Sequence, residues 1–251
     1  MIWNVEKYGS GKEVDLDRIV HLLNVTYNFP SSEYFIYKDA AYLPYLRFVL
    51  SSESQMAYLL TDERRELCGF AHLKIAGSTV FVINVIIKAA YRNAGLGTKL
   101  LLFALKDILE RKANVLVRLR LDVFKSNSKA LNLYLRWGLK IEATSYRYQI
   151  PAPELSADDS TFYYKTDGFG FTQLYQVDTA VGYLINNTKL VLKENFKGKL
   201  SEIPQPKPHT ILSACLISLE PKPMPLLDQS FSMCAPFRDM ISALSQITAY
   251  E

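Results

Sequence analysis

Residues 85–100 read VIIKAAYRNAGLGTKL. The first three close an apolar, β-branched run that starts at Val80 and predicts a buried strand. Apolar residues then recur at helical spacing, so a helix is predicted from about Gly95 to Lys112. The start of such a helix presents free backbone N–H groups, and glycines at 95 and 97 leave room for a bulky anion beside them. The order of strand, glycine turn and helix therefore predicts a site for a phosphate or pyrophosphate.

Spacing argues against two common phosphate-binding motifs. A P-loop has the pattern G-x-x-x-x-G-K-[ST], but Arg92 stands where its first glycine would be and Thr98 separates Gly97 from the lysine. A dinucleotide fingerprint needs a third glycine at the position of Leu100. The pattern that remains is Arg92-x-x-Gly95-x-Gly97.

A second strand and helix follow. Residues 115–123 form another β-branched and leucine-rich run, and residues 124–139 read FKSNSKALNLYLRWGL. Asn127 is predicted to cap a helix that Gly138 ends, with Tyr134 two turns after the cap.

Together, the two stretches resemble the signatures of the GCN5-related N-acetyltransferase (GNAT) superfamily. These signatures are a [QR]-x-x-G-x-[GA] turn and, after the next strand, N-x-x-A-x-x-x-Y-x-x-x-G-[FL]. The resemblance covers residues 1–167 and implies an α/β fold with a mixed sheet and acetyl-CoA as cofactor. It implies cofactor contacts from Val85, Ile86, Ile87, Arg92, Asn93, Ala94, Gly95, Leu96, Gly97, Thr98, Asn127 and Tyr134.

The resemblance also suggests catalytic roles. Tyr134 is the candidate acid that protonates the departing thiolate. Asp122 is the candidate base for the acceptor amine, acting directly or through a water. A carboxylate in an apolar strand is costly to bury unpaired, so the alternative is a salt bridge to Arg118, Arg120 or Arg147.

The resemblance implies that the acceptor is a primary amine of a small molecule or of a peptide or protein N-terminus. A helix predicted over residues 15–28 is followed by an aromatic-rich segment, residues 34–48. In the superfamily this region walls the acceptor side of the cleft, which gives Glu33 and Tyr34 as substrate-binding candidates. The alternative is that the aromatic residues only pack a helix onto the sheet.

Turn signals predict the order of the strands. The runs at residues 56–61, 66–75 and 78–88 are joined by short turns and should form antiparallel hairpins. The third run should pair in parallel with residues 115–123, because a helix connects them. Residues 140–150 and 161–166 are expected to complete the sheet. Residues 168–251 are expected to form a smaller α+β appendix, with strands near 174–177, 181–185, 189–193 and 211–219, proline-marked loops up to residue 225, and a helix over 237–248.

Composition limits the remaining functions. A net charge of +4 and a pI near 8.8 suit an anionic cofactor but support neither nucleic-acid nor membrane binding. Cys68, Cys215 and Cys234 show no paired or C-x-x-C spacing, so neither a disulfide framework nor a metal site is expected. With no signal-like segment, a cytoplasmic protein is expected. Two alternatives stay open: a GNAT-fold module that binds a partner through its appendix, and a homodimer.

Overall fold

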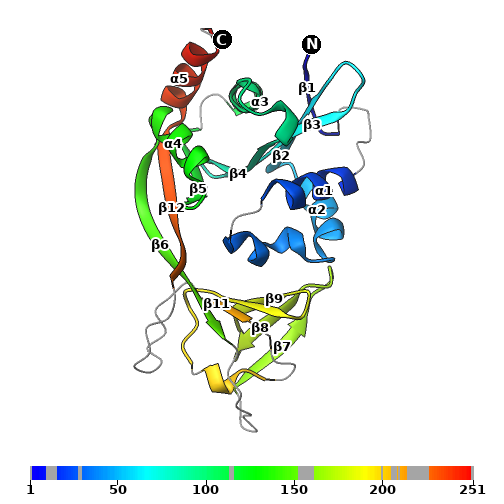
Figure 1. The fold of residues 1–251 in the computed structure, drawn as a ribbon, viewed down its shortest axis with the longest axis vertical. Helices are drawn as coiled ribbons and strands as arrows, with labels where there is room; N and C mark the ends of the chain where they lie inside the picture. The colour runs from blue at the N-terminus through cyan, green and yellow to red at the C-terminus, as the bar shows by residue number, and fades with distance from the viewer. Residues whose placement is uncertain are drawn as a thin grey trace. The chain divides into compact units, whose positions relative to one another are not determined.

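The computed structural model describes residues 2–9, 16–27, 30–112, 116–151, 161–198, 200–204, 208, 210–213 and 226–249. The chain forms two compact units (Figure 1). The first unit contains residues 1–27, 46–143 and 231–251, and the second contains residues 28–45 and 144–230. This division does not coincide with the boundary expected near residue 167. The longer segment of the second unit begins within a strand, β6 (Lys140–Pro151), and the end of the chain returns to the first unit.

The sheet of the first unit begins with five strands in chain order: β1 (Asn4–Lys7), β2 (Gln55–Thr61), β3 (Leu67–Ala76), β4 (Thr79–Ile87) and β5 (Arg118–Phe124). The first four are antiparallel to one another. β4 and β5 are parallel, as the intervening helix requires. The predicted hairpins and the predicted parallel pair are confirmed.

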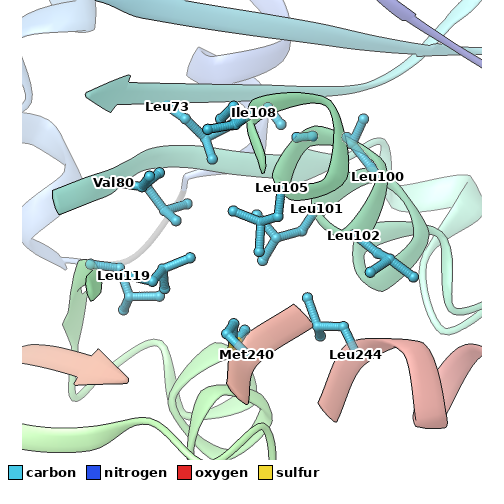
Figure 2. Packing of buried hydrophobic residues seen from close by; sticks show 14 of the residues in the cluster. Leu73, Val80, Leu100, Leu101, Leu102, Leu105, Ile108, Leu119, Met240 and Leu244 are labelled. Atoms are coloured by element: carbon cyan, nitrogen blue, oxygen red, sulfur yellow. The ribbon is translucent and has the colours of Figure 1, made fainter. Parts of the chain in front are cut away.

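Helix α3 (Leu96–Lys112) packs its apolar stripe on one face of this sheet. Figure 2 shows Leu101, Leu105 and Ile108 of α3 close to Val80 of β4 and Leu119 of β5. Each such side chain contributes about 1.5–3 kcal/mol when fully buried. This burial fixes the start of α3 relative to the end of β4. The other helices are α1 (Leu16–Thr26), α2 (Tyr42–Leu50), α4 (Ser128–Arg136) and α5 (Phe237–Ala249).

The strand that completes the first unit comes from the end of the chain. β12 (Leu226–Pro236) lies between β5 and β6 (Lys140–Pro151) in the strand order, and its residues from Phe231 onward belong to the first unit. Met233 and Ala235 of β12 are buried in the core. Residues 161–166, which were expected to complete the sheet, form β7 (Phe162–Thr166) at the far end of the strand order, in the second unit.

The strands of the second unit follow β6 in the same hydrogen-bonded strand order. They are β7 (Phe162–Thr166), β8 (Thr172–Gln176), β9 (Thr179–Ile185), β10 (Lys189–Leu192) and β11 (Thr210–Ser213), and the end of β6 pairs with β11. β7 to β10 are antiparallel and β11 is parallel to β10, which repeats the order of β1 to β5. Between β10 and β11 the described residues form only the short helix η4 (Leu200–Glu202), where the first unit has α3.

Candidate functional site

The two parallel strands of the first unit part before they end. β4 pairs with β5 from Thr79 to Val82, opposite Arg118 to Leu121. β4 then continues for five residues and β5 for three, all of them described, without pairing with each other. The backbone of Val85, Ile86 and Ile87 pairs with β3 on its other side. The edge facing β5 is therefore available to a ligand with amide groups of its own.

A β-bulge marks the point where the strands part. His72 lies opposite Asn84 and Leu73 opposite Val82, so Ile83 is an extra residue on β4. Bulges bend a strand and increase its local twist, which gives a physical reason for the parting of β4 from β5.

The glycine turn has the conformation that an anion site needs. The short helix η3 (Ala89–Tyr91) follows β4, Asn93 and Gly95 both have φ of 65°, and α3 begins at Leu96. The first N–H groups of α3 have no partner within the helix. The side chains of Leu96 and Thr98 are buried, so these two residues would offer an anion their backbone rather than their side chains.

Arg92 is exposed and partly fixed. Its Nε donates a hydrogen bond to the carbonyl oxygen of Ile87 at 3.0 Å. This bond holds the Nε end of the guanidinium at the end of β4. The terminal N–H groups of the guanidinium take no part in this bond. Asn93 and Ala94 are also exposed.

The second predicted motif lies beyond the end of β5. Asn127 occupies the N-cap position of α4, as predicted, but its side chain makes no capping hydrogen bond. Its backbone N–H donates to the carbonyl of Phe124 at 3.0 Å instead. Because β4 and β5 are parallel, the turns that follow them lie at the same edge of the sheet. The side-chain amide of Asn127 therefore makes no hydrogen bond to the helix that this residue caps.

Tyr134 lies on α4 and is half-buried against the core of the first unit. Its ring is 5.4 Å from that of Trp137. Burial raises the pKa of Tyr134 to about 12, so the phenol is protonated at neutral pH. It is in the state that a general acid requires.

Asp122 is exposed, and the argument that it must be paired because it is buried is wrong. It is the first residue of β5 beyond the pairing with β4. Of its expected partners, Arg120 instead bonds Glu142 of β6 at 3.2 Å and lies 6.0 Å from the centre of the Phe81 ring. The structure records no ion pair between Asp122 and another described residue.

Glu33 and Tyr34 belong to the second unit. The carboxylate of Glu33 bonds Lys189 Nζ at 2.8 Å and lies 3.9 Å from Lys38 Nζ. The hydrogen bond from Lys189 is the main reason why the pKa of Glu33 is lowered. Tyr34 is buried.

Sequence reasoning missed a set of buried polar residues on β3 and β4. Tyr27 donates its hydroxyl proton to Asn84 Oδ1 at 3.1 Å. His72, opposite Asn84, bonds Gln55 Oε1 through Nε2 at 2.8 Å. The available signal was one amide at position 84 inside an otherwise apolar run.

A cavity of about 450 Å³ in the first unit lies elsewhere. Lys7, Glu53, Gln55 and Arg111 are among its lining residues. Arg111 is near the C-terminal end of α3, roughly 21 Å along the helix from Gly97. This cavity is therefore separate from the glycine turn.

Other site types find no support in the part of the chain that the structure describes. It contains no group of three or more histidine, cysteine or acidic side chains placed to hold a metal. None of its helices is long and apolar enough to cross a membrane. Cys68 and Cys234 are free thiols, while Cys215 lies outside the described residues.

Comparisons with known proteins agree with this geometry. Residues 16–139 match the model of the acetyltransferase (GNAT) family. The structure matches a tandem GNAT protein from the clavulanic acid biosynthesis pathway with a TM-score of 0.57 and 11% identity, over 94% of this chain and 99% of that one. No curated protein matches the sequence.

Two further solved structures are similar at lower scores. One is the ribosomal-protein-S18-alanine N-acetyltransferase from Escherichia coli, with a TM-score of 0.47 and 14% identity over 94% of both chains. The other is a GNAT family acetyltransferase from Elizabethkingia anophelis with acetyl-CoA bound, with a TM-score of 0.40 and 21% identity over 57% of this chain and 80% of that one.

The cofactor of this family is acetyl-CoA, and the residues present fit it. A pyrophosphate suits the free N–H groups at the start of α3, and an extended arm carrying amides suits the unpaired edge of β4. Residues 16–139 thus match the acetyltransferase (GNAT) family, and the fold of the chain is one that GNAT acetyltransferases share.

Proposed function

We propose that this protein is an acetyl-CoA-dependent N-acetyltransferase that acts by direct transfer. The acceptor is a primary amine of a small molecule or of a peptide or protein N-terminus. The observation that carries the proposal is the end of β4–β5 pairing at Val82 and Leu121, on the strand that leads into the glycine turn. When bound, acetyl-CoA supplies the activated acetyl thioester.

The chain divides the binding of this cofactor among three places, which are the end of β4, the glycine turn and the start of α4. Backbone groups of Val85, Ile86 and Ile87 hydrogen-bond its extended arm. Residues 92–98 hold the pyrophosphate through backbone N–H groups and the Arg92 guanidinium, and the amide of Asn127 bonds the cofactor as well. These roles are supported by the unpaired edge and by the exposed turn.

Tyr134 delivers the proton that the departing thiolate needs. Its raised pKa supports this role, because a phenol with a pKa of about 12 is fully protonated at neutral pH. Contact with the Trp137 ring and with the core limits the movement of its own ring.

Asp122 takes the proton from the attacking amine, directly or through one water. Its exposure and its lack of a recorded ion pair leave the carboxylate able to accept that proton. Glu33 and Tyr34 remain candidates for the acceptor side. An amine that bound Glu33 would compete with Lys189, which already bonds its carboxylate.

A thiol-release assay tests the proposal. The full chain is given acetyl-CoA with a panel of small amines, polyamines and peptides with free N-termini, and calorimetry measures coenzyme A binding in parallel. We expect tight binding of coenzyme A and release of thiol with at least one amine. Binding without thiol release for any amine would favour the alternative, a GNAT-fold module that recognises a partner. No binding at all would overturn the cofactor site as well.

The setting of this activity is inferred from simple features. We place the protein in the cytoplasm, acting without nucleic acid or membrane, because its charge is only mildly positive and its described cysteines are free. A homodimer remains one option for its assembly. Sedimentation of the purified chain would decide this.

A further inference from the structure

The connector between α1 and α2, residues 28–45, is part of the second unit although the body of both helices belongs to the first. We propose that Asn186 and Lys189, together called the clamp, hold this connector in one position and thereby influence which acceptor amine the enzyme uses. The part about the acceptor rests on the proposed function. The mechanical part rests on contacts within the second unit alone.

Asn186 holds the middle of the connector with three hydrogen bonds. Its Nδ2 donates to the carbonyl of Lys38 at 2.9 Å, and its backbone N–H donates to Asp39 Oδ2 at 2.7 Å. Its Oδ1 accepts from the N–H of Ala40 at 3.4 Å. Three consecutive connector residues are thus bonded to one residue nearly 150 positions later in the chain.

Lys189 holds the start of the connector. Its ammonium bonds Glu33 at 2.8 Å and lies 5.9 Å from the centre of the Tyr34 ring. Glu33 is further stabilised as a carboxylate by Lys38 at 3.9 Å. The Tyr34 ring and the Glu33 carboxylate together bind the Lys189 ammonium. These contacts fix which connector residues lie beside the first residue of β10.

Aromatic rings hold the end of the connector. Tyr45 lies 5.6 Å from the ring of Phe169 and 5.5 Å from that of Phe171, both in the turn before β8. Asp167 fixes this turn by accepting the N–H groups of both phenylalanines at 3.0 and 3.1 Å. The connector is therefore fastened at its start, middle and end.

The chain itself links the connector to the acyl-transfer face. Residue 28 directly follows Tyr27, whose hydroxyl bonds Asn84. Asn84 lies two residues beyond Val82, at the start of the unpaired edge of β4. The connector is therefore continuous in sequence with the residue that bonds the start of this edge.

The second unit shows no comparable opening of its own. β10 and β11 are paired along their full length, from Lys189 to Leu192 and from Thr210 to Ser213. Its described residues include no glycine-turn helix between these strands. The unit repeats the strand order of the first, but its described residues show none of the features that would hold a cofactor. Its contacts with the connector give it a different role.

The turn that holds Asn186 allows a closely matched test. Asn186 and Asn187 both have positive φ, 48° and 57°, which glycine adopts without strain. Asn186→Gly keeps the turn and removes two of the three bonds to the connector. Asn187→Gly makes the same change at the neighbouring position, where no bond to the connector is recorded. Lys189→Met is a second clamp variant that keeps the aliphatic stem over Tyr34.

Hydrogen exchange of residues 33–41 and steady-state kinetics provide separate readouts. For Asn186→Gly and Lys189→Met we expect about tenfold faster exchange in the connector, since each loses one to two hydrogen bonds. We also expect the acceptor KM to rise about three- to tenfold while the Kd for coenzyme A stays within about twofold. Asn187→Gly should behave as wild type in all three measurements.

The two parts of the proposal can fail separately. Unchanged exchange in both clamp variants, or equal acceleration in Asn187→Gly, would overturn the clamp. Faster exchange with an unchanged acceptor KM would overturn its role in acceptor selection. If the wild type acetylated no amine, the proposed function would fail together with that role, and the exchange rates would still support or overturn the clamp.

Discussion

Val82 of β4 and Leu121 of β5 are the last residues paired between the two parallel strands of the first unit. The next residue on β4, Ile83, is the extra residue of a bulge, and the next on β5 is Asp122. The bulge thus falls where the unpaired backbone edge of β4 begins. The side chains of the apolar stripe of α3 are buried in the core of this unit, whereas the carboxylate of Asp122 is exposed. Four predictions depend on this arrangement or on the residues around it.

Arg92→Gln should weaken coenzyme A binding about tenfold, because it removes a charge-assisted hydrogen bond to phosphate. Lys106→Gln is the matched control: Lys106 is an exposed cation on α3, two turns and more beyond the glycine turn. Calorimetry at low and high salt measures both. Equal affinities for the two variants would show that Arg92 does not touch the cofactor.

Tyr134→Phe should lower kcat by about 10² to 10⁴ and change the Kd for coenzyme A far less, because the ring stays and only the hydroxyl is lost. Since the pKa of Tyr134 is raised to about 12, the wild-type rate should not fall through tyrosine ionisation near pH 10. Tyr146→Phe, at an exposed tyrosine of β6, controls for loss of a phenol as such. Full turnover by Tyr134→Phe would remove it from the chemistry.

The parts of the fold that could be predicted are those with local signals. The strand, turn and helix over residues 80–112 follow from periodicity and two glycines, and the structure confirms them. No local pattern in the sequence indicates where β12 lies in the sheet. Its place between β5 and β6 depends on strand pairing across about a hundred residues, and the prolines that precede it indicate only loops.

The candidate site shows the same limit. Motif spacing pointed to the glycine turn and to α4, but the parting of β4 from β5 depends on a bulge at Ile83 that no motif encodes. For the aromatic residues of the connector, the alternatives were a wall of the acceptor cleft and the packing of a helix onto the sheet. Tyr45 packs against Phe169 and Phe171, more than 120 residues later in the chain.

Asp122→Asn should reduce kcat about 10²-fold at neutral pH if Asp122 receives the amine proton, because the amide cannot accept it. The acceptor KM should change little. Asp178→Asn, at another exposed aspartate, makes the same charge change in the second unit and should have no effect. A pH–rate profile that Asp122→Asn leaves unaltered would assign the base to a water or to another group.

His72 should make the fold sensitive to acid. Burial lowers the pKa of His72 to about 4 from a usual 6.5, and its Nδ1 is buried without a hydrogen-bond partner among the described residues. The unfolded chain therefore binds a proton more readily than the folded one. The stability from the neutral ring is present above about pH 6.5 and is lost as the pH falls from about 6.5 to about 4.

The His72→Gln variant tests this linkage, since an amide keeps a polar group beside Gln55 but does not titrate. Between pH 7 and about pH 4.5, the wild type should lose on the order of 2 to 3 kcal/mol more unfolding free energy than the variant. Urea unfolding at the two pH values measures the difference, and His21→Gln, on the exposed side of α1, should lose as much as wild type. Equal losses in wild type and His72→Gln would mean that the ring is protonated at no cost in the folded state, with its orphan Nδ1 reaching an acceptor.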